Sequence, residues 1–167
     1  MNPGFPVSLS QLLTILSAQI SAVTGINSNY VFPSLIDELV LNDPPADCFI
    51  TLKPKKFLSP TAVMDGAGLQ SKWFTGSLEI LIWFRLDLDR SGWDSDYLQQ
   101  ANSVNLFNTW QLLLQALEQW LPQDNNGNGL LIEPLRCEEF SILPRQKEKN
   151  WGQLISIWQM SYVALIA

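Results

Sequence analysis

The sequence predicts an α+β fold, a mainly antiparallel sheet of four to five strands with two helices packed on one face. Three observations lead to this prediction. Residues 75–88, TGSLEILIWFRLDL, alternate with a period of two, as a strand with one buried face does. Residues 8–25 and 104–121 carry apolar residues at helical spacing. Residues 130–142 and 153–165 are strand-like and are joined by a short charged tip, which favours an antiparallel pair.

The first element is the helix over residues 8–25. Ser8 and Gln11 match a capping box, in which the hydroxyl accepts from the third amide and the Gln side chain reaches back. Gly25 stands where a left-handed C-cap belongs. Short strands are expected next at residues 30–32 and 48–52, the second of them ending before the K-P-K-K sequence.

Residues 55–74 are predicted to form a long loop or hairpin insertion within a single domain that spans residues 1–167. The stretch contains Pro and Gly residues and shows no sustained period. A connection of this length inside a compact domain is usually functional or disordered. Its apolar residues, Phe57 and Trp73 among them, favour contact with a neighbour, and the alternative is a flexible loop that orders only on assembly.

The strand over residues 75–88 presents two unlike faces. One face is wholly apolar, whereas the other carries Trp83 between Glu79 and Arg85. This second face is too apolar for bulk water and too charged for a core. We expect it to meet either a helix of the same chain or another subunit.

A second helix is expected over residues 104–121, with Asp96 or Ser103 as its cap and Pro122 as its stop. Residues 124–129, DNNGNG, are expected to form a tight turn, because Asn and Gly tolerate positive φ. The two strands of the last hairpin follow this turn.

The composition favours assembly with other copies of the chain. Hydrophobic residues make up 47% of the 167 residues and charged residues only 16%, against about 25% charged in typical domains. The chain also contains seven Trp residues, a type enriched at interfaces. A Trp-rich core is the alternative interpretation. We expect a homo-oligomer, which would hide the excess apolar surface.

The charge balance argues against several classes of function. The net charge is −6 and the chain has no His. Nucleic-acid binding depends on a Lys/Arg footprint, which an acidic chain lacks. The commonest general base and metal ligand is also missing, and no nucleophile elbow, phosphate-binding loop or zinc-protease motif is present. We therefore expect a protein that is not an enzyme and needs no cofactor.

The cysteines and the apolar segments bear on location. Cys48 and Cys137 show no paired-cysteine spacing, which indicates two free thiols in a reducing compartment, with one disulfide as the alternative. No segment approaches about 20 uninterrupted apolar residues, and the start of the chain lacks a signal-peptide pattern. We expect no membrane span, and residence in the cytoplasm or in an assembly formed there.

Two loops place oxygen ligands at alternate positions, as a calcium-binding loop does. The candidate ligands are Asp87 and Asp89 in one loop and Asp124, Asn126 and Asn128 in the other. Position twelve of such a loop should be a bidentate Glu, but Leu98 and Leu135 stand there. Turn chemistry accounts for both loops without a metal, so they are weak candidates.

Positive charge concentrates at two predicted tips, one in the insertion and one in the last hairpin. Solvated loop charges are the ordinary interpretation; the alternative is that they steer docking onto an acidic partner. The predicted interface joins these tips to neighbouring aromatic and charged residues: Lys55, Lys56, Phe57, Trp73, Trp83, Arg85, Arg145, Lys147 and Lys149.

Four local sequences add a family resemblance: GSLEILIW at 76–83, LLQAL at 113–117, LLIEPLR at 130–136 and W-x-x-x-Y at 158–162. With the amphipathic first helix and the order of the elements, they resemble the tail terminator proteins of long-tailed bacteriophages, also called neck or tail-completion proteins. The likeness spans most of the chain and rests on element order and hydrophobic spacing.

The resemblance implies an α+β subunit that closes into a ring, expected to be a hexamer. Such a ring caps the tail tube, ends its polymerisation and joins the tail to the head connector, and DNA passes through its channel without sequence recognition. The protein would lie in the tail or neck of the virion and in the host cytoplasm during assembly. A head–tail connector or head-closure protein is the alternative, and a calcium-dependent binding module is a further one.

Overall fold

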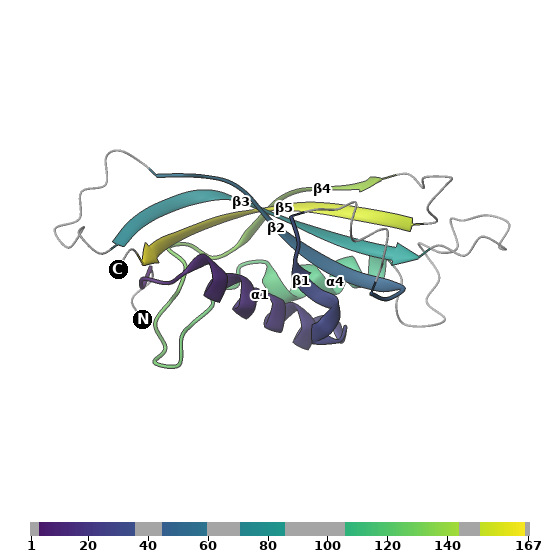
Figure 1. Cartoon of the computed structure of the whole chain (residues 1–167), viewed down its shortest axis with the longest axis horizontal. Helices are drawn as coiled ribbons and strands as arrows, with labels where there is room; N and C mark the ends of the chain where they lie inside the picture. The colour runs from purple at the N-terminus through teal and green to yellow at the C-terminus, as the bar shows by residue number, and fades with distance from the viewer. Residues whose placement is uncertain (1–3, 36–44, 60–70, 86–105, 144–150, 166–167) are drawn as a thin grey trace, which may run out of the picture.

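The computed structural model describes residues 4–35, 45–59, 71–85, 106–143 and 151–165, and these form one sheet with helices on one side (Figure 1). The elements are α1 (Leu9–Thr24), the 3₁₀ helix η1 (Ser28–Tyr30), β1 (Val31–Pro33), β2 (Cys48–Leu58), β3 (Ser71–Arg85), α4 (Leu106–Leu117), β4 (Arg136–Leu143) and β5 (Trp151–Leu165). The strand order is β1-β2-β3-β5-β4. β1 runs parallel to β2, and the other neighbours are antiparallel. The predicted α+β class is confirmed.

Helix α1 begins and ends as the sequence predicts. The Ser8 Oγ accepts a hydrogen bond from the Gln11 backbone N–H, and the Gln11 side chain accepts one from the Ser8 N–H, each at 3.1 Å. Gly25 closes the helix at φ 76°, a left-handed conformation that glycine adopts without steric cost. The Gln19 side chain donates to the Ala116 carbonyl at 3.2 Å and so ties α1 to α4.

Strands β2 and β3 are longer at the hairpin end than the sequence indicates. β2 continues from Leu52 to Leu58 and β3 begins at Ser71, so both ends of the predicted insertion are strand. The strand was expected to end before Lys53, but it continues through Pro54, which lies where β2 has an exposed flank, so its missing N–H removes no ladder bond. A β-bulge follows between Pro54 and Phe57. At its other end β3 is described only as far as Arg85.

The predicted strand over residues 130–142 was wrong at its start, because β4 begins only at Arg136. Leu130, Leu131 and Leu135 are fully or almost fully buried, but they enter the core from irregular chain. Pro134 interrupts the apolar run and cannot donate to a ladder, which explains why an apolar pattern here does not give a strand.

Helix α4 ends at Leu117, earlier than the predicted stop at Pro122. Gln119 takes φ 62° and its N–H donates to the Leu135 carbonyl at 2.8 Å, while the Leu135 N–H donates to the Trp120 carbonyl at 3.0 Å. These tertiary bonds turn the chain toward β4. The predicted caps at Asp96 and Ser103 lie outside the described residues.

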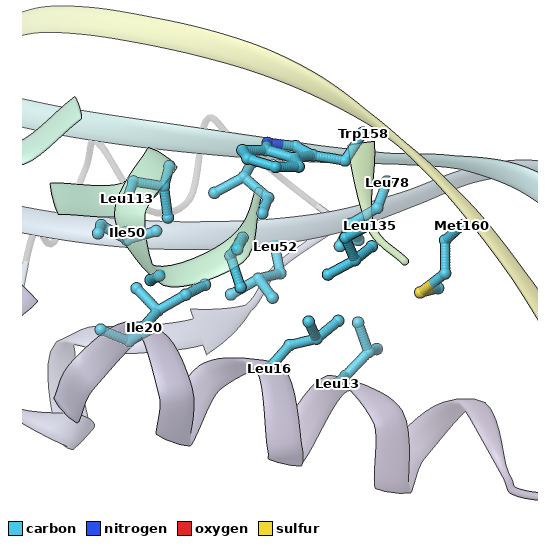
Figure 2. Close-up of a cluster of buried hydrophobic side chains, with 14 of the residues drawn as sticks. Leu13, Leu16, Ile20, Ile50, Leu52, Leu78, Leu113, Leu135, Trp158 and Met160 are labelled. Carbon is cyan, nitrogen blue, oxygen red and sulfur yellow. The ribbon is translucent and has the colours of Figure 1, made fainter. Parts of the chain in front are cut away.

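The core lies between the helices and one face of the sheet. In Figure 2, Leu13, Leu16 and Ile20 point from α1 toward the sheet, where Trp158 and Met160 of β5 lie. Trp158 is fully buried, and its indole N–H donates to the Ser156 hydroxyl at 2.9 Å, which donates to the Ile80 carbonyl at 3.0 Å. The apolar alternation predicted for β3 therefore does face a core. Neither helix in the described part of the chain is long and apolar enough to cross a membrane.

Candidate assembly interface

The sheet has a second, narrower apolar cluster on the face opposite the helices. Phe49, Leu81 and Trp83 are buried there. The Phe49 ring stacks on Phe32 at 6.2 Å and on Trp83 at 5.6 Å between ring centroids. The Trp83 indole N–H donates to the Thr51 hydroxyl at 3.0 Å. Because Trp83 is only 3% exposed, this predicted interface residue already has most of its contacts within the chain.

Charged and polar residues follow this cluster along the same face. Lys55 Nζ lies 3.2 Å from Glu79 Oε2, with the Glu79 side chain only 14% exposed. Arg85 pairs with Asp47 at 3.3 Å, where both side chains are exposed. Exposed pairs of this kind contribute little to stability. Because the Arg85 side chain is exposed and only weakly held by this pair, it remains accessible to a partner.

The predicted basic tip in the insertion belongs to strand β2. Lys55 and Lys56 are both exposed, whereas Phe57 is half-buried and meets the Tyr162 ring edge-on at 5.8 Å. Sequence reasoning grouped these three residues as one surface. The bulge separates them, because it turns Phe57 toward the core and leaves the two lysines outside.

Trp73 lies on β3 near the same end of the sheet. Its indole N–H is buried and has no hydrogen-bond acceptor among the residues that the structure describes. The ammonium group of the preceding residue, Lys72, lies 5.8 Å from the centre of the Phe74 ring. The prediction that Trp73 belongs to an interface stays a prediction.

Strand β4 carries a group of exposed acidic and apolar residues that sequence reasoning missed. Glu138 and Glu139 are exposed, and Phe140 and Ile142 are 52% and 40% exposed. Glu118, at the end of α4, accepts a hydrogen bond from the Cys137 N–H at 2.9 Å. The E-E-F sequence in a strand of the last hairpin was the available signal, because an edge strand exposes such side chains.

Burial disfavours the thiolate form of both cysteines, Cys48 on β2 and Cys137 on β4. Burial raises the pKa of Cys48 to about 12. Burial and then the Glu118 carboxylate raise the pKa of Cys137 to about 11. Two strands lie between β2 and β4, so the cysteines are at least ~14 Å apart at about 4.8 Å per strand. A disulfide needs Cα atoms within about 7 Å, which rules out the intrachain disulfide left open above.

The Asp124 loop is a self-contained turn. The Asp124 carboxylate accepts from the Asn126 N–H at 2.8 Å and from the Asn128 N–H and side-chain amide, each at 2.9 Å. The Asn128 side chain, then its backbone, lowers the pKa of Asp124. These bonds account for the turn without an ion. Asp87 and Asp89 of the other loop lie outside the described residues, as do Arg145, Lys147 and Lys149.

The comparisons with known proteins bear on the fold. No protein-family model and no curated protein matches the sequence. Among solved structures, the chain is similar to one in a structure described as the virion of native gene transfer agent (GTA) particle, with a TM-score of 0.51 and 12% identity. The match covers 92% of this chain and 93% of that chain. At this identity the likeness establishes a shared fold over almost the whole length of both chains.

Proposed function

We propose that this chain is a structural protein of a phage-like virion. The observation that carries the proposal is the fold shared with a chain of a gene transfer agent virion, over 92% of one chain and 93% of the other. The resemblance of the sequence to tail terminator proteins does not depend on this structural match and supports the proposal independently. The role is structural, with no reaction to catalyse.

In its specific form, the proposal is a ring of six copies that caps the tail tube, ends its polymerisation and joins the tail to the head connector. The chain exposes large apolar side chains, with Leu58 at 61%, Leu165 at 53% and Phe140 at 52%, which contacts in a ring would cover. The net charge of −6 suits a channel that must let DNA pass without holding it by counterion release. Assembly takes place in the host cytoplasm, and the finished ring lies at the neck of the virion.

The test begins with the mass of the purified chain. Light scattering during size-exclusion chromatography should give about six times the 18.9 kDa of one chain, either alone or after tail tubes are added. Electron microscopy should then show rings end-on and rings at one end of the tubes. A lasting monomer that ignores tubes at high concentration would contradict the ring.

The same preparation distinguishes the terminator from a head-closure protein. A terminator binds purified tail tubes and shortens the tubes formed when it is present during polymerisation. A ring that binds only the portal end of purified heads and leaves tube length unchanged would identify a head-closure protein instead.

A further inference from the structure

The two long sides of the sheet carry opposite charge. On the β2 side, Lys53, Lys55 and Lys56 lie within four consecutive residues. On the β4 side, Glu138 and Glu139 are consecutive, and Glu118 contacts the start of β4 through the Cys137 N–H. Glu79 pairs with Lys55 on the β2 side, and Arg136 pairs with Glu138 on the β4 side. In the described part of the chain, the β2 side therefore keeps an excess of positive charge and the β4 side an excess of negative charge.

The opposite charges stand at matching levels of the sheet. Lys53 pairs with Glu79 across β2 and β3, Glu79 with Ile157 across β3 and β5, and Ile157 with Glu139 across β5 and β4. A single cross-strand row therefore starts at a lysine on one side and ends at a glutamate on the other.

The strand directions permit one copy to continue the sheet of the next. Each of the pairs β2–β3, β3–β5 and β5–β4 is antiparallel, so β4 runs antiparallel to β2. When a second copy is placed side by side in the same orientation, its β2 lies antiparallel to β4 of the first. This arrangement is heterologous, the kind of contact that forms a ring when the rotation from one copy to the next closes the circle.

We propose that the Lys53–Lys56 side of one copy docks on the Glu138–Glu139 side of the next, which makes the basic and acidic sides of the sheet the two halves of one subunit contact. This inference rests on the proposed function and specifies its interface. The occupant of each side is a second copy of this chain.

The contact is made chiefly by side chains. Pro54 has no N–H and the bulge after it breaks the spacing of β2, so an uninterrupted hydrogen-bond ladder cannot form along the lysines. β1 pairs only with Ile50, Thr51 and Leu52 on the outer flank of β2, and beyond them Lys55 and Lys56 are exposed and Lys53 is partly exposed. On the acidic side, Phe140 follows Glu139 in β4 and is still 52% exposed although its ring also packs on Trp110 at 4.9 Å between centroids.

The experiment uses two charge-reversed forms of the full chain. One carries Lys53→Glu and Lys56→Glu, which leaves the Lys55–Glu79 pair intact, and the other carries Glu138→Lys and Glu139→Lys. Each form alone has two sides of the same sign, so the concentration for half-assembly should rise at least about tenfold. An equimolar mixture restores opposite signs at every contact and should recover the wild-type mass, with alternating copies detected by native mass spectrometry.

The matched control is Lys72→Glu, which reverses an exposed lysine on β3 that belongs to neither charged group, and should leave assembly unchanged. Circular dichroism and the thermal midpoint verify that each form is folded. If the wild type assembles and both folded forms assemble equally well, or if the mixture stays dissociated, this interface is wrong while the ring stands. If lysine reversal abolishes tube binding alone, the basic side belongs to the tube protein. A wild type that never assembles overturns the proposed function as well.

Discussion

The two faces of the sheet differ in how completely this chain covers them. The helix-side face packs aliphatic side chains and Trp158 against α1 and α4 in one continuous cluster. On the opposite face, the buried cluster among the described residues consists of Phe49, Leu81 and Trp83, and the Lys55–Glu79 pair follows it. The same strands therefore supply a core on one side and a short apolar patch beside charges on the other. The larger cluster on the helix-side face therefore contributes more to folding stability than the smaller cluster on the opposite face.

The largest expected effect tests the helix-side face. Trp158→Ala removes a fully buried indole and its hydrogen bond to Ser156, so it should lower the free energy of unfolding by about 3–5 kcal/mol. Urea unfolding followed by circular dichroism measures the loss. Trp158→Phe is the control and should lose less, because it keeps most of the packing. Equal losses in the two variants would contradict a packing origin.

The next effect tests the opposite face. Thr51→Val deletes the acceptor of the Trp83 indole N–H and leaves a buried donor unpaired, at a cost of about 1–3 kcal/mol. Trp83→Phe removes the donor instead. In urea unfolding, the double variant should lose less than the two single losses combined. Strictly additive losses would show that this hydrogen bond does not contribute, and the second cluster would then be packing alone.

A smaller effect is expected from the N-cap of α1, the helix that packs on the helix-side face. Ser8→Ala removes the hydroxyl that caps α1 and should cost about 1 kcal/mol. The thermal midpoint measures the change. Ser10→Ala is the control, because Ser10 is an exposed residue inside the first turn, and it should have little effect. A Ser8→Ala protein as stable as the wild type would mean that α1 is held by its buried face alone.

The smallest effect lies outside both faces, in the Asp124 turn. Because folding lowers the pKa of Asp124, its contribution is present above the unfolded pKa of about 3.9 and is lost as pH falls through the lower folded pKa. The difference in thermal midpoint between the wild type and Asp124→Ala should therefore shrink as pH falls below about 4. A difference that stays constant with pH would place the contribution elsewhere.

Local signals were enough to predict much of the fold. The caps of α1 and the alternation in β3 depend on near neighbours in sequence, and both were confirmed. The length of β2 and the end of α4 depend on partners far along the chain. β3 pairs with Phe57 and Leu58 beyond the bulge and so extends β2, and the backbone bonds of Leu135 turn the chain after Leu117. A local sequence pattern does not predict contacts between residues so far apart in the chain.

The candidate interface was harder to predict. Trp83 was predicted to be an interface residue because its indole lies between charged residues in the sequence. In the structure, the Trp83 ring stacks on Phe49 and its N–H donates to Thr51, both on the neighbouring strand. Glu138 and Glu139 were not among the predicted interface residues, because their exposure follows from the position of β4 at the edge of the sheet. Strand order is set by tertiary pairing, and sequence periodicity carries little information about it.

The two β-bulges have a consequence for the fate of misassembled chains. One interrupts β2 between Pro54 and Phe57, and the other interrupts β4 between Cys137 and Glu139, so each outer long strand has an extra residue. Cross-β fibrils require flat strands that stack in register over many layers. Extra residues near both margins of the sheet bend those strands out of register. Bulges at the margins of a sheet therefore disfavour its edge-to-edge extension into flat stacks.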